Sequence, residues 1–98
     1  MNNQNTNTLE EYRKEIDKID YNIFTLLKQR FEIVENVVEY KKTHNLEIYQ
    51  KNREEEIKVK ISEISQELKL SESFLQDVME LILKESKEIQ QQKLNNHK

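Results

Sequence analysis

Residues 26–38, LLKQRFEIVENVV, carry the pattern that decides the fold. Leu26, Ile33 and Val37 are spaced so that they share one face of a helix, and Arg30 stands where an apolar residue would complete the row. The alternation of three and four residues continues on both sides, through Leu9, Tyr12, Ile16, Ile19, Ile23 and Tyr40. This pattern predicts one long helix with a heptad seam, from about residue 8 to residue 43.

The composition extends this prediction to the whole chain. Glycine and proline are both absent, so the tight turns of β-hairpins have almost no suitable residues. Hydrophobic residues make up 35% and charged residues 36%, a balance that supports a folded chain only if the apolar residues are patterned. The pattern is helical, and we predict an all-α fold of three helices with one long N-terminal helix.

Capping signals place the two shorter helices. Asn45 is suited to a left-handed cap after the first helix, and Asn52 with Glu55 resembles a capping box that opens the second. The third opens at Ser71, or at Ser73 with Gln76 three residues on. The apolar rows of the two helices are Ile57, Ile61, Ile64 and Leu68, with an end near Lys69, and Phe74, Val78, Leu81 and Ile82.

The length favours one domain, which we place over residues 8–92 between a disordered N-terminal tail (1–7) and a C-terminal tail (93–98). A helix over residues 8–43 is about 50 Å long, whereas a compact chain of this size has a radius of gyration of about 13 Å. Such a helix overhangs its own domain and leaves apolar surface in water. A second copy covering it predicts a homodimer.

Several classes of function are disfavoured. With no cysteine and two distant histidines, His44 and His97, no metal site is expected. The start MNNQNTNT lacks the features of a signal peptide and no run approaches the ~20 apolar residues of a membrane span, so we expect a cytoplasmic protein without a membrane partner. A net charge of −3 with interleaved signs argues against nucleic acid.

Besides Arg30, two groups of polar residues call for an interpretation. Ser86 and Gln90 continue the row of Leu75, Met79 and Ile82, either because the helix emerges into solvent there or because a polar ligand lies inside. The stretch NREEE at 52–56 is by itself well explained as a solvated first turn of a helix. We assign no chemistry to His44 or Tyr49.

Arg30 has two interpretations. It is either a buried polar residue that fixes coiled-coil register, balanced by a carboxylate such as Glu54 or by an acid of a partner chain, or it binds an anionic ligand. Lys41 lies eleven residues on, about 20° around the helix and roughly 16 Å along it, so both reach a small anion between them. Arg13, roughly 25 Å from Arg30 on the same helix, reaches that anion only from another protomer.

Taken together, these segments resemble the small all-helical chorismate mutases. The resemblance covers about residues 9–90 and rests on YRKEIDKID at 12–20, LLKQRFEIVENVVEYK at 26–41, NRE at 52–54 and ESKEIQ at 85–90, in this order. It implies three helices per chain in an intertwined homodimer with two shared active sites. It also implies the site residues: Arg30, Lys41, Arg53, Glu54, Ser86 and Gln90 from one chain, Arg13 from the partner chain, and the backbone of Gln50, where the family often has an acidic residue.

The family reaction converts chorismate to prephenate on the route to phenylalanine and tyrosine, without nucleophile, cofactor or proton transfer. The resemblance assigns Lys41 and Gln90 as catalytic donors to the ether oxygen that gains charge as its bond breaks. Arg30, the partner's Arg13 and Ser86 would hold the two carboxylates of the substrate. Glu54 would accept from the ring hydroxyl, with Arg53 helping to set it.

Two other functions remain open. A lyase of the same fold, which eliminates pyruvate from isochorismate, uses a similar cationic pocket. A non-catalytic dimeric helical scaffold would explain Arg30 as a register device.

Overall fold

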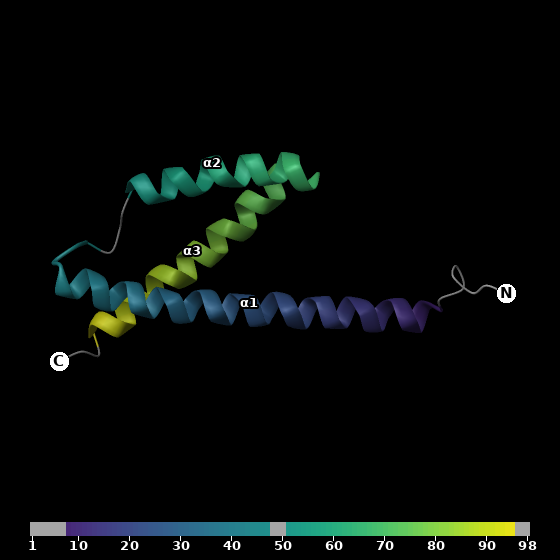
Figure 1. Ribbon diagram of the computed structural model, residues 1–98, viewed down its shortest axis with the longest axis horizontal. Coiled ribbons are helices and arrows are strands. Elements are labelled where there is room, and N and C mark those ends of the chain that lie inside the picture. Colours follow the sequence, from purple (N-terminus) through teal and green to yellow (C-terminus); the bar gives the residue numbers. More distant parts are fainter. Residues whose placement is uncertain (1–7, 48–50, 96–98) are drawn as a thin grey trace. The chain divides into compact units, whose positions relative to one another are not determined.

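The fold is described from a computed structural model, which covers residues 8–47 and 51–95. Three helices make up these residues: α1 (Leu9–Thr43), α2 (Lys51–Leu68) and α3 (Glu72–Asn95), labelled in Figure 1. No strand occurs within the described residues. The predicted all-α fold with three helices and a long first helix is confirmed.

Both ends of α1 are fixed by the residues around them. At its start, the Thr8 backbone N–H donates to Glu11 Oε1 (2.9 Å) and the Glu11 N–H donates to Thr8 Oγ1 (3.1 Å), which is a reciprocal capping box. At its end, Asn45 has a φ of 58° and the Leu46 N–H donates to the carbonyl of Lys41 (2.8 Å). This is a Schellman cap, and the predicted left-handed conformation of Asn45 is confirmed.

The predicted start of α2 is wrong by two residues, since a cap at Asn52 would make Arg53 the first residue of the helix. The helix begins at Lys51, so Asn52 lies inside the first turn and does not cap it. The physical reason is that a helix does not require a side-chain cap of its own at a given residue, because other groups or water can satisfy the first backbone N–H groups.

A tight connection joins α2 to α3. Lys69 has a φ of 59°, and the Leu70 N–H donates to the Ser65 carbonyl (3.0 Å), so α2 ends in a Schellman-type turn close to the predicted residue. Ser71 then caps α3, since its Oγ accepts from the Phe74 N–H (3.2 Å). Of the two serines considered from the sequence, the structure selects Ser71.

The sequence suggested that Gln76 caps the helix together with Ser73, but the structure shows another contact for its side chain. Its side-chain amide donates to the backbone carbonyl of Lys58 (3.3 Å) and links α3 to α2. At the other end, α3 continues through Asn95, three residues beyond the domain boundary placed at 92, and Leu94 in this last turn is half-buried. A chain without glycine or proline has no residue here that would stop the helix earlier.

The chain divides into two compact units, Met1–Glu32 and Ile33–Lys98. The second unit contains the last turns of α1 together with α2 and α3, and Figure 1 shows α3 returning from the end of α2 toward those turns. Val38 on α1 (1% exposed) and Ile57 on α2 are the two buried apolar side chains among the described residues. Val34, half-buried one turn before Val38, belongs to the same face of α1.

The heptad seam of α1 is exposed in the single chain. This holds for all of its apolar members: Leu9, Tyr12, Ile16, Ile19, Ile23, Leu26, Ile33, Val37 and Tyr40. The helix therefore has two apolar faces in its C-terminal part, one around Val38 that packs within the chain and the seam, which the chain itself does not cover.

Within residues 8–47 and 51–95, no helix combines the length and the apolar character that a bilayer crossing requires.

Candidate active site

A polar pair joins the end of α1 to the end of α3 inside the second unit. Lys41 Nζ donates a hydrogen bond to Gln90 Oε1 at 3.0 Å. Gln90 is buried, with 8% of its surface exposed, and Lys41 is half-buried. Because Oε1 of the amide accepts from Lys41, the Nε2 group of Gln90 keeps its two N–H donors for another acceptor.

The C-terminal cap of α1 holds the backbone of Lys41. Its carbonyl accepts the Leu46 N–H in the Schellman cap described above, and this hydrogen bond fixes the backbone of Lys41 at the end of the helix. In the same turn, the rings of Tyr40 and His44 stack with centroids 3.9 Å apart, and His44 Nδ1 lies 2.9 Å from the Tyr40 carbonyl oxygen. Sequence reasoning missed this stack, although an aromatic residue four before a histidine at a helix end is a visible signal.

Ser86 lies one turn before Gln90 on the same face of α3. It is 4% exposed, and its Oγ donates to the Ile82 carbonyl at 2.9 Å. The simpler interpretation of this row, in which the helix emerges into solvent at Ser86 and Gln90, is therefore wrong. Lys41 of α1 hydrogen-bonds to Gln90 at this end of α3, a contact that the sequence of α3 alone does not reveal.

Partial burial of Lys41 changes the pKa of its ammonium group. Burial lowers the pKa of the Lys41 ammonium below its usual 10.5, because the cation loses water contacts that the neutral amine needs less. An anionic group bound beside Lys41 would offset this loss.

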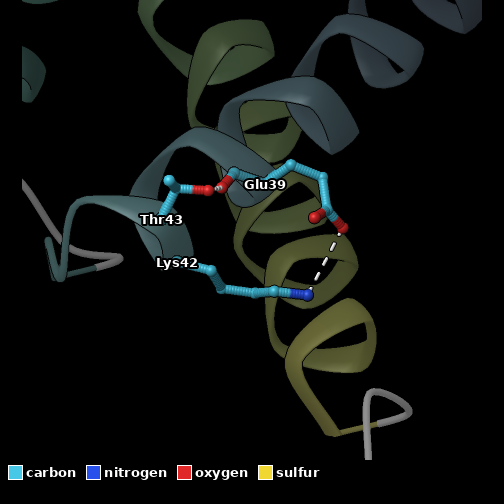
Figure 2. Close-up of polar contacts among 3 residues, drawn as sticks. All are labelled: Glu39, Lys42 and Thr43. Carbon is cyan, nitrogen blue, oxygen red and sulfur yellow. Dashed lines mark hydrogen bonds and ion pairs between the residues drawn. The ribbon is translucent and has the colours of Figure 1, made fainter.

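The next lysine along α1 has a different environment, shown in Figure 2. Lys42 Nζ lies 3.3 Å from Glu39 Oε2, an ion pair within one helix turn. Thr43 Oγ1 donates to the Glu39 backbone carbonyl at 2.8 Å. Lys42 therefore has a carboxylate of its own helix as its partner, whereas Lys41 reaches across to α3.

A second polar contact joins α2 to α3. Glu54 Oε2 lies 2.8 Å from Lys87 Nζ, and Glu54 is half-buried. Arg53, which we expected to set Glu54, instead pairs with Glu56 on its own helix (Nη1 to Oε1, 3.3 Å) and is exposed. A lysine follows Ser86 directly in ESKEIQ, yet its partner lies 33 residues earlier in the chain, so the sequence did not identify Lys87.

The remaining predicted residues lie elsewhere. Arg13 is exposed and Arg30 is half-buried, and both lie on α1 within the first unit. Their part in the site stays a prediction. Gln50 and Tyr49 lie outside the described residues. In the second unit the structure thus brings Lys41 to Gln90, with Ser86 one turn away.

The family of type II chorismate mutases matches this chain over residues 12–91. The chain belongs to the chorismate mutase type II family. This confirms the resemblance found from its segments, and the match includes every described residue of the polar pairs above. Chorismate mutases are isomerases.

Two curated relatives are each named as a bifunctional chorismate mutase/prephenate dehydratase. The protein of Aquifex aeolicus (strain VF5) is 42% identical over 60 residues, which are 61% of this chain and 17% of the relative. That of Buchnera aphidicola subsp. Schizaphis graminum (strain Sg) is 33% identical over 89 residues, 91% of this chain and 23% of the relative. The chain thus spans about a fifth of the length of these relatives. No solved structure gives a significant match.

Proposed function

We propose that this chain rearranges chorismate to prephenate, a step toward phenylalanine and tyrosine, in sites shared by two copies of the chain. The observation that carries the proposal is the contact of Lys41 with buried Gln90 inside a chorismate mutase type II domain. The resemblance to the family assigns both residues to the reacting ether oxygen. They lie 49 positions apart in the sequence and meet in the fold.

The reaction asks for charge stabilisation and orientation. In the rearrangement one carbon–oxygen bond breaks as one carbon–carbon bond forms, and negative charge grows on the ether oxygen. Lys41 Nζ and Gln90 Nε2 supply donors at that oxygen, which favours the transition state over the bound substrate. Their partial burial strengthens both interactions, because little water competes with them.

The two carboxylates of the substrate need further cations and donors. Arg30 offers a planar fork that binds a carboxylate through two hydrogen bonds. Ser86 lies on the same face of α3 as Gln90 and would turn its hydroxyl to a carboxylate oxygen when substrate is bound. Arg13 would come from the second copy, since its distance from Arg30 along α1 is too great for one small molecule.

The second copy is supported by the surface of α1. A seam of nine apolar residues is exposed along a helix of 35 residues, while two apolar side chains in the described residues are buried. A single chain thus leaves this whole apolar seam in water, which a soluble monomer rarely does. Pairing of two seams around a two-fold axis covers both at once.

The experiment that tests the proposal offers chorismate and isochorismate separately to the purified protein and identifies the products. We expect prephenate from chorismate and no pyruvate from isochorismate. Pyruvate from isochorismate would favour the lyase. Turnover of neither substrate, together with no saturable binding of a dicarboxylate that resembles the transition state, would leave the helical scaffold.

The lowered pKa of Lys41 predicts the alkaline limit of activity. Raising the pH removes the Lys41 proton, so kcat/KM, which reports the free enzyme, should fall at a pH below 10.5. Bound dianion stabilises the ammonium, so the corresponding fall in kcat should lie at higher pH. Steady-state kinetics from neutral pH upward measures both limbs, and a kcat/KM that stays constant beyond 10.5 would contradict the role of Lys41.

A further inference from the structure

We propose that Lys87 is a positioning residue that holds Glu54 for the ring hydroxyl of the substrate. This inference rests on the proposed function and deepens it. The observation is the contact between Lys87 Nζ on α3 and Glu54 Oε2 on α2, 2.8 Å long, between two helices of the same unit.

The position of Lys87 on α3 explains why it reaches α2. Successive residues of a helix are about 100° apart around the axis, so Lys87 points well away from the face of its neighbour Ser86. Ser86 is buried on the row that ends in Gln90, whereas Lys87 and Glu54 both line an open groove of about 570 Å³. Neighbouring residues in one turn of α3 therefore face different ways: Ser86 lies on the buried row and Lys87 forms the ion pair with Glu54.

The contact leaves Glu54 able to accept another hydrogen bond. A carboxylate has two oxygens, and Lys87 is paired with Oε2. Oε1 is then available to a hydroxyl donor, and its direction is fixed because the other oxygen is held. The neighbouring Arg53 does not serve this purpose, since its guanidinium is paired with Glu56.

Charge gives Lys87 a second effect. A doubly negative substrate is repelled by an ionised Glu54, and a cation 2.8 Å from that carboxylate offsets the repulsion. Glu54 and Lys87 then present a hydrogen-bond acceptor with no net charge. An acceptor of this kind selects for a hydroxyl without weakening the binding of the two carboxylates.

The test replaces Lys87 by Met, which keeps the length of the side chain and removes its charge. Because the hydroxyl is bound alike in substrate and transition state, we expect KM to rise about tenfold while kcat changes little. Lys87→Arg should restore most of the affinity. The matched control is Lys84→Met, one turn earlier in the same groove, which should leave both constants unchanged.

Two further measurements separate positioning from a structural role. On a chorismate analogue without the ring hydroxyl, Lys87→Met should lose much less of its kcat/KM than on chorismate, because only the charge offset is then missing. In a Glu54→Gln background Lys87→Met should cause no further loss. An equal loss on both substrates, or a full loss in the Glu54→Gln background, overturns the inference. Thermal unfolding should change little, because the pair is partly exposed.

The outcomes for the two proposals differ. An active wild type with an unaffected Lys87→Met variant overturns the role of Lys87 alone. A wild type without activity on chorismate overturns the proposed function, and this inference falls with it.

Discussion

Replacing Lys41 by Met is expected to lower kcat on chorismate by about 10²- to 10³-fold, the usual effect of removing one donor from a site of developing negative charge. Two losses combine in this variant. The ammonium no longer faces the ether oxygen, and Gln90 loses the contact at 3.0 Å that holds its carbonyl oxygen. A freed amide can rotate, so its N–H donors lose their fixed direction as well.

The control for this variant is Lys42→Met, which removes the same charge from the neighbouring position. Lys42 pairs with Glu39 on its own helix, and such a pair contributes about 0.3–0.5 kcal/mol to stability. Steady-state rates of both variants, with circular dichroism to compare their helix content, separate loss of the donor from loss of charge. Equal kcat values for the two variants would show that Lys41 has no special part.

Mixing an Arg13→Ala chain with a Lys41→Met chain is expected to restore about a quarter of wild-type activity from two nearly inactive parents, if sites are shared in a symmetric dimer. Half of the dimers formed by random exchange contain one chain of each kind. In each of these, one site receives both lesions and the other receives an intact Arg13 and an intact Lys41. Activity measured after unfolding and refolding of equal amounts together gives the recovery.

The control mixture combines Lys41→Met with Gln90→Ala. These two residues meet within one unit of one chain, so every site of a mixed dimer keeps one lesion and no recovery should appear. Mass spectrometry under native conditions establishes that subunits have exchanged. Mixed dimers without recovery in the first experiment would argue that each site is built from one chain.

Helix α1 could be predicted from the sequence almost to its ends, because a seam of three- and four-residue steps over more than thirty residues matches the period of a helix and of no other regular structure. The cap at Asn45 followed from the residue type, since asparagine tolerates a positive φ. The equivalent turn at Lys69 carries no such signal, because a lysine adopts this conformation only where the connection from α2 to α3 requires it.

The residues of the candidate site also fall into those that could be predicted from the sequence and those that could not. Ser86 and Gln90 could be singled out as polar residues that continue an apolar row, and Lys41 by its helical spacing from Arg30. Whether the row on α3 ends in solvent, however, depends on what covers it in the fold. Lys87 could not be singled out, since it belongs to no row and its meaning comes from Glu54 on a different helix. Periodicity identifies the face of a helix, whereas the identity of its neighbour is a tertiary property.

In the proposed homodimer, the scarcity of buried apolar side chains in the described residues has a consequence for how the protein is maintained in a cell. Where two chains supply each other's missing interior, association and folding become one equilibrium, and its position depends on the amount of protein present. Dilution would then produce unfolded chains, which proteases can cleave, and not folded inactive monomers. The abundance of such a protein sets its lifetime as well as its catalytic capacity.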